Sequence, residues 1–179
     1  MKKSKISDSR GLHHETTISN EQLKNIDIKL LILDVDGVLT NGQVYVCDCG
    51  NEIKGFSTQD GIGLKLLLAS GIEIAIISGR ESMATKKRLR ELNIKHIYLG
   101  IADKIEVFNE LKNKLSVENQ NIAYIGDDLP DLLVMQQVGF SIAVNNAVDA
   151  IKDIAHHITT RKGGDSAVRE ACDFILKSK

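Results

Sequence analysis

The stretch 30–36 reads Leu30-Leu31-Ile32-Leu33-Asp34-Val35-Asp36. Its apolar residues are typical of a buried strand, and two carboxylates follow where that strand ends. In an open α/β sheet, ligands bind at the carboxyl ends of the strands. Two acids placed there repel each other and lose water, so we expect the site to need a cation or a proton. A lone Asp-x-Asp also suits a plain turn after a core strand, so the interpretation depends on the rest of the chain.

Apolar strands alternate with amphipathic helices beyond this stretch. We expect strands at 29–34, 73–77, 96–99, 122–125, 140–143 and 156–158. We expect helices at 60–70, 81–92, 102–115, 129–137, 147–152 and 165–177. The alternation predicts an α/β fold, a doubly wound parallel sheet with helices on both faces. Residues 42–55 break the rhythm and predict a small β-hairpin insertion above the sheet, with no large cap domain.

Length and composition are those of one globular domain. The chain has 179 residues, of which 42% are hydrophobic and 4% aromatic, and its net charge is −1. These values give no reason to expect a nucleic-acid or membrane partner. Segment 1–25 is polar and lacks the apolar core of a signal peptide, so we expect a tail, with a short helix around 21–25, before a domain at 26–179. We expect no metal site at His13-His14.

The cysteines indicate a compartment rather than a site. Cys47, Cys49 and Cys172 are an odd number without zinc-type spacing. A reducing, cytoplasmic compartment is the simplest interpretation.

Three more strand ends carry polar groups. Ser78-Gly79-Arg80 follows one strand, Lys104 begins the helix after another, and Asp127-Asp128 with Asp131 follows a third. A hydroxyl and backbone N–H groups at a helix start suit a phosphate. Each motif alone also fits a capped turn or a solvated side chain. Their coincidence at successive strand ends favours one shared site.

Together these motifs resemble the haloacid dehalogenase superfamily, whose phosphatases use an aspartate nucleophile and Mg²⁺. From Asn25 to Leu176 the chain also resembles the subfamily of 3-deoxy-D-manno-octulosonate 8-phosphate (KDO 8-phosphate) phosphatases. The matching stretches are Asp34-Val-Asp-Gly-Val-Leu-Thr, Asp60-Gly-Ile-Gly, Ile77-Ser-Gly-Arg, Tyr124-Ile-Gly-Asp-Asp-Leu-Pro-Asp, Val138-Gly, Ala143-Val and Gly163-Gly…Ala167-Val-Arg-Glu. The resemblance implies hydrolysis of KDO 8-phosphate in lipopolysaccharide precursor synthesis.

The resemblance implies specific catalytic roles. Asp34 is expected to attack phosphorus and form an aspartyl phosphate. Asp36 is expected to protonate the leaving oxygen and then to take a proton from the attacking water. Ser78 and Lys104 are expected to neutralise the phosphoryl oxygens in transfer.

The resemblance also implies a magnesium site. The expected ligands are the Asp34 carboxylate, the Asp36 backbone carbonyl and the Asp127 carboxylate, with waters completing an octahedron. Asp128 and Asp131 are expected in the outer shell, where they orient those waters or Lys104.

Substrate contacts are implied for the segment after the hairpin and for several basic residues. The expected contacts are Asp36, Ser57, Thr58, Gln59, Asp60, Gly61, Lys65, Arg80, Arg88 and Lys104. Arg88 also belongs to a basic run, 86–90, that makes an ordinary solvated helix face. Two positions depart from the family pattern, because Gln59 stands where a basic residue is common and Asp165 where the C-terminal loop is usually basic. These departures bear on the substrate and leave the hydrolytic chemistry unaffected.

Three alternatives remain open. One is a phosphatase of another acidic sugar phosphate, such as a nonulosonate 9-phosphate. A signalling receiver domain also forms an aspartyl phosphate, but Asp36 and the first-strand position of Asp34 disfavour it. A catalytically inactive domain is disfavoured because no motif residue is missing. Because a short hairpin cannot exclude water by itself, and relatives with this insertion use neighbouring subunits as the lid, we expect a homotetramer.

Overall fold

The computed structural model describes residues 27–48, 50 and 52–177. The predicted tail, the short helix around 21–25 and the His13-His14 pair lie outside the described residues. Among the described residues, no helix has the length and apolar character needed to cross a membrane.

One parallel sheet of six strands forms the centre of the molecule, in the order β5-β4-β1-β6-β7-β8. The strands are β1 Leu30–Leu33, β4 Glu73–Ser78, β5 His96–Leu99, β6 Ile122–Gly126, β7 Phe140–Ala143 and β8 His157–Ile158. The side chains of β1 are fully buried, as the apolar stretch predicted. This sheet confirms the predicted α/β fold, and its strands lie within two residues of the predicted positions.

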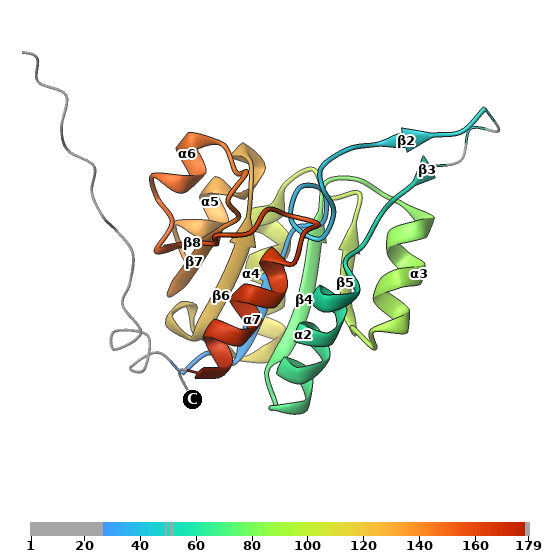
Figure 1. Ribbon diagram of the computed structural model, residues 1–179. Coiled ribbons are helices and arrows are strands. Elements are labelled where there is room, and N and C mark those ends of the chain that lie inside the picture. The colour runs from blue at the N-terminus through green and yellow to red at the C-terminus, as the bar shows by residue number, and fades with distance from the viewer. Residues whose placement is uncertain (1–26, 49, 51, 178–179) are drawn as a thin grey trace, which may run out of the picture.

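Helices cover both faces of the sheet (Figure 1). They are α2 Thr58–Ala69, α3 Met83–Glu91, α4 Lys104–Leu115, α5 Leu132–Met135, α6 Asp149–Lys152 and α7 Ala167–Lys177, with 3₁₀ turns η1 Asn119–Asn121 and η2 Leu129–Asp131. Helices α2 and α7 lie side by side on one face, and α4 lies on the other (Figure 1).

The single helix predicted at 129–137 was wrong, because η2 precedes a four-residue α5 there. Pro130 supplies no N–H in the first turn, and the Asp128 and Asp131 side chains bond reciprocally to this turn's backbone.

The predicted hairpin is present and projects away from the sheet (Figure 1). Strands β2 Tyr45–Val46 and β3 Glu52–Ile53 pair antiparallel. Tyr45, Val46 and Ile53 are 48%, 68% and 59% exposed, so the hairpin's apolar side chains are uncovered in the single chain. Cys47 takes part in a disulfide bond that the sequence did not predict, whereas Cys172 is free and buried.

Candidate active site

The carboxyl end of β1 is the place where the direction of the sheet reverses. The chain passes from β1 to β4 and β5 on one side, and then crosses to β6, β7 and β8 on the other. Crevices in open α/β sheets form at such points. A cavity of about 340 Å³ lies here, lined by Asp34, Asp36, Gly42, Ser78, Gly79, Arg80, Lys104, Asp127, Asp128, Pro130 and Asp131. The structure therefore brings together the residues predicted at all four strand ends.

Lys104 is a buried cation between two carboxylates. It begins α4, and its Nζ lies 2.9 Å from Asp34 Oδ1 and 2.8 Å from Asp131 Oδ1. Burial alone would lower the pKa of this ammonium, but Asp34 and Asp131 outweigh burial and raise it. Lys104 is therefore held protonated beside the predicted nucleophile.

Asp131 has both of its carboxylate oxygens occupied. Oδ1 accepts hydrogen bonds from Lys104 and from the Tyr124 hydroxyl, and Oδ2 accepts from the backbone N–H groups of Asp127 and Asp128. These donors orient Asp131 as a support for Lys104 and for the loop after β6. Tyr124, inside β6, belongs to one of the matching stretches, but no role was predicted for it.

Asp34 and Asp127 have the geometry of cation ligands. One oxygen each from Asp34, Asp127 and Asp131 lie within 4.8 Å of one another. Because the Asp131 oxygens are already hydrogen-bonded, Asp34 and Asp127 are the carboxylates left for an ion. Asp127 Oδ1 is buried and has no hydrogen-bond partner among the described residues. Two hard oxygen ligands in a cavity with room for water suit Mg²⁺.

The pKa values of these two acids are raised. Burial, opposed by Lys104, raises the pKa of Asp34 to about 6. Burial, aided by the charges of Asp34 and Asp131, raises the pKa of Asp127 to about 8. Like charges in a partly dry cavity favour the protonated forms, and a divalent cation relieves the same repulsion.

Close backbone contacts hold the loop after Asp34. Gly37 has φ +94°, and a Cβ there would lie 1.9 Å from Asp127 Oδ2. Gly163 lies so near that a Cβ on it would be 1.6 Å from the Gly37 carbonyl, and the Gly164 N–H donates to Val38 O at 3.0 Å. The paired glycines therefore let the C-terminal loop pack against the loop that follows Asp34.

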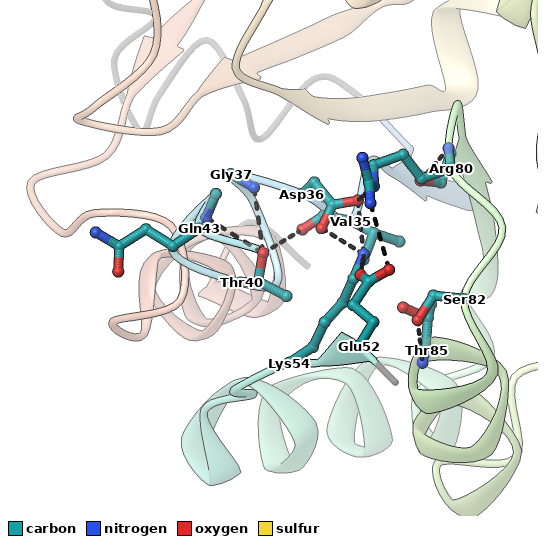
Figure 2. Close-up of polar contacts among 12 residues, drawn as sticks. Val35, Asp36, Gly37, Thr40, Gln43, Glu52, Lys54, Arg80, Ser82 and Thr85 are labelled. Carbon is teal, nitrogen blue, oxygen red and sulfur yellow. Dashed lines mark hydrogen bonds and ion pairs between the residues drawn. The ribbon is translucent and has the colours of Figure 1, made fainter. Parts of the chain in front are cut away.

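Asp36 is bound by a residue that the sequence did not single out. Lys54 donates to both Asp36 carboxylate oxygens, at 2.5 and 2.7 Å, and lies 3.1 Å from Glu52 Oε1. Arg80 lies 3.3 Å from Glu52 Oε2 and 3.9 Å from Asp36 Oδ2 (Figure 2). Burial would raise the pKa of Glu52, but Lys54 and Arg80 outweigh it and lower that pKa. These four side chains join the hairpin stem to the cavity.

The predicted substrate segment at the start of α2 is directed toward α7. Ser57 caps α2 and lies 3.2 Å from the Ser166 hydroxyl, which donates to Gln59 Oε1 at 3.0 Å. Asp60 is 2% exposed, and its carboxylate accepts a hydrogen bond from the Arg169 N–H at 2.7 Å. In the single chain none of these side chains lines the 340 Å³ cavity.

The remaining predicted contacts also lie outside that cavity. Thr58 and Lys65 are exposed on α2. Arg88 on α3 is half-buried against Gly61, where an added Cβ would lie 2.5 Å from the guanidinium. A larger cavity of about 680 Å³ lies beside β8 and α7 and is lined in part by Gln59, Arg161 and Arg169. It lacks the carboxylates at the strand ends, so the smaller cavity is the candidate active site.

Known proteins support this interpretation. A family model of haloacid dehalogenase-like hydrolases matches residues 96–171. The chain is 45% identical over 150 residues to the 3-deoxy-D-manno-octulosonate 8-phosphate phosphatase KdsC of Yersinia pestis, covering 84% of this chain and 80% of that protein. The KdsC of Escherichia coli K12 matches with the same identity and coverage.

A solved structure extends the comparison to the fold. The 3-deoxy-D-manno-octulosonate 8-phosphate phosphatase of Moraxella catarrhalis, in complex with magnesium, phosphate and KDO, superposes with a TM-score of 0.86. It is 45% identical, with 89% of this chain and 92% of that chain covered. The chain therefore belongs to the 3-deoxy-D-manno-octulosonate 8-phosphate phosphatases, a family of haloacid dehalogenase-like hydrolases.

Proposed function

We propose that this cavity hydrolyses KDO 8-phosphate to KDO and phosphate, with Asp34 as the nucleophile. The observation that carries the proposal is the position of Asp34 at the end of β1, with Lys104 Nζ at 2.9 Å and Asp127 in the same cavity. The family assignment supplies the substrate, and the strand-end geometry supplies the reacting groups.

In the first step an Asp34 oxygen attacks phosphorus, and the bond from phosphorus to the sugar oxygen breaks. Lys104 and the buried Ser78 at the end of β4 face the same cavity as Asp34. Positive charge and a hydroxyl donor there stabilise the negative charge on the transferring phosphoryl oxygens. Asp36 gives its proton to the departing sugar oxygen.

In the second step Asp36 accepts a proton from a water molecule, and that water releases phosphate from Asp34. The same residue thus returns to its protonated form for the next cycle. Mg²⁺, held by the Asp34 and Asp127 carboxylates and the Asp36 carbonyl, would supply charge neutralisation between the carboxylates and the phosphate. Asp131, with its two oxygens occupied, keeps Lys104 and the Asp127 loop in place.

For the sugar acid we propose Arg80 as the contact from this chain's own cavity, with Asp36 and Lys104 toward the phosphate end. The Arg80 side chain is 52% exposed, so it can exchange its contact with Glu52 for a carboxylate beyond the phosphate site. Contact with substrate through a second copy is proposed for the predicted residues that lie outside that cavity in one chain, which are Ser57, Thr58, Gln59, Gly61, Lys65 and Arg88. For Asp60, whose side chain is buried and bonded to the Arg169 N–H, only the backbone is proposed to make that contact. We propose a cytoplasmic location.

We propose that the active assembly is a homotetramer in which neighbouring hairpins form the lid. The exposed apolar side chains of β2 and β3 support this, because such a surface is stabilised when a second copy covers it. Light scattering should give about four times the 19.7 kDa subunit mass. A mass of one subunit at assay concentration would contradict the tetramer and leave the hydrolase proposal intact.

The decisive experiment is phosphate release from a panel of sugar phosphates with and without Mg²⁺. We expect the highest kcat/KM for KDO 8-phosphate and no turnover in chelator. Glucose 6-phosphate and a nonulosonate 9-phosphate serve as comparisons. A tenfold preference for the nonulosonate, equal to about 1.4 kcal/mol of transition-state stabilisation, would reject the substrate and keep the chemistry.

A further inference from the structure

Lys54 is a buried cation whose main partner is the proposed acid of the reaction. It follows β3, and only 1% of its side chain is exposed. An ammonium buried in this way is destabilising unless it is paired and hydrogen-bonded. Its Nζ meets both oxygens of Asp36, at 2.5 and 2.7 Å, and Glu52 Oε1 at 3.1 Å (Figure 2). The pairing directs Lys54 to the cavity rather than to solvent.

The contact to both oxygens restricts how the Asp36 carboxylate can turn. Within the described part of the chain, Lys54 is the hydrogen-bond donor to that carboxylate, while Arg80 lies farther away at 3.9 Å. Glu52 and Lys54 are two residues apart, so they project from the same face of the hairpin stem. Glu52 therefore holds Lys54 from one side while Asp36 occupies the other.

We propose that Lys54 is a positioning residue that orients Asp36 for proton transfer to the leaving oxygen. The inference rests on the proposed role of Asp36 and adds a residue from the hairpin to it. When Asp36 carries its proton, one oxygen still accepts the hydrogen bond from Lys54 and the other holds the proton toward the leaving oxygen. Asp36 loses its proton to the sugar oxygen as the P–O bond breaks, and it regains one from the attacking water. A proton donor misplaced by about 1 Å loses on the order of 10²-fold in rate.

The test compares two leaving groups in Lys54→Met. The sugar oxygen of KDO 8-phosphate needs protonation to depart, whereas the phenolate of 4-nitrophenyl phosphate departs without it. The parameter is kcat/KM, because it reports phosphoryl transfer to Asp34 and excludes hydrolysis of the aspartyl phosphate. We expect about a 10²-fold loss with KDO 8-phosphate, within the range for general acid catalysis, and less than about fivefold with 4-nitrophenyl phosphate.

Two conservative variants keep the test decisive if Lys54→Met folds poorly. Lys54→Arg restores a cation that can bond both carboxylate oxygens, so it should recover most of the KDO 8-phosphate activity. Glu52→Gln loosens Lys54 while leaving Asp36 unchanged, and should give a several-fold loss limited to KDO 8-phosphate. Lys29→Met removes an exposed lysine that lies 3.7 Å from Asp27, and it should behave as wild type.

Several outcomes separate this inference from the function on which it rests. Equal losses on both substrates in Lys54→Met and Glu52→Gln would reduce Lys54 to a structural role and overturn the proposal. In the Asp36→Asn background, Lys54→Met should cost less than about threefold with KDO 8-phosphate, and a full additional loss would also overturn it. If Asp36→Asn loses both substrates equally, the acid role of Asp36 fails, and this proposal fails with it. Turnover of 4-nitrophenyl phosphate without KDO 8-phosphate in the wild type would instead reject the proposed substrate.

Discussion

Asp34 and Asp60 are two buried carboxylates with nearly the same acidity and different surroundings. Asp34 is 8% exposed and Asp60 is 2% exposed. Burial is the largest cause in both cases and raises the pKa of each to about 6. Asp34 borders a cavity shared with Lys104 and Asp127. Asp60 lies between α2 and α7, where it accepts the Arg169 N–H.

Burial and a raised pKa therefore do not by themselves identify a reacting acid. The Asp34 carboxylate faces the buried ammonium of Lys104 and a cavity with room for a phosphate group. The charge of Asp60 is used at the first turn of α7, where a carboxylate interacts favourably with the helix dipole. The two carboxylates differ in the groups that contact them, and these groups predict a different response to substitution at each position.

The largest effect is expected from Asp34→Asn. The amide cannot form the aspartyl phosphate, so kcat should fall by at least about 10⁴-fold. Removing one charge from the Asp34–Asp127–Asp131 cluster relieves repulsion, so the melting temperature without Mg²⁺ should stay equal or rise. Phosphate release and thermal unfolding measure the two effects. Normal turnover in this variant would mean that Asp34, like Asp60, is only a structural acid.

Lys104→Met should have the next largest effect, because it removes the cation that distinguishes the Asp34 environment. Two buried carboxylates would lose their partner, which costs about 3–5 kcal/mol of folding free energy. We expect kcat to fall by about 10²–10³-fold at matched folded fraction. Lys112→Met, which changes a half-buried lysine on the same helix, is the control and should change kcat less than threefold. Comparable losses in the two variants would contradict a specific role for Lys104.

The strand-end residues could be predicted from the sequence, because their positions depend on a simple pattern. An apolar strand fixes where its last residue lies, and parallel strands bring their ends to one edge. Asp34, Ser78, Lys104 and Asp127 all follow from that rule and from the family resemblance.

Lys54, Glu52 and the surroundings of Asp60 could not be predicted in the same way. Lys54 returns to Asp36 from a hairpin 18 residues away, and no periodicity indicates which side chain of so short a stem turns inward. Asp60 bonds Arg169 across 109 residues of sequence. Its position in the first turn of α2 favours a helix start, but the α7 contact depends on the packing of two helices that are distant in sequence.

Magnesium binding should depend on pH because both proposed carboxylate ligands, Asp34 and Asp127, have raised pKa values. With the pKa of Asp127 raised to about 8, a proton must leave before the carboxylate can bind an ion near pH 7. The ionised fraction of Asp127 rises about fivefold between pH 7 and pH 8, so the apparent affinity should rise by about the same factor. Calorimetry in buffers of different ionisation enthalpy should detect close to one released proton at pH 7. No proton release and a flat affinity would show that Asp127 is already ionised.

The smallest effect on activity is expected from Asp60→Asn, and its main effect should be on stability. The amide oxygen can still accept the Arg169 N–H, and the side chain lies outside the cavity, so kcat/KM should change less than threefold.

The folded-state pKa of Asp60 is about 6 against an ordinary value of 3.8. The folded protein therefore binds the extra proton between these values, and stability from this group falls as pH rises through that window. The ionised carboxylate costs at most about 3 kcal/mol above pH 6, a cost that the amide does not carry. Because Asp34 and Asp127 titrate in both proteins, the wild-type-minus-variant difference in urea unfolding free energy isolates Asp60. That difference should move in favour of the variant from pH 4.5 to pH 7, and a constant difference would contradict the raised pKa. A tenfold or greater loss of kcat/KM would place Asp60 with Asp34 in the reacting site.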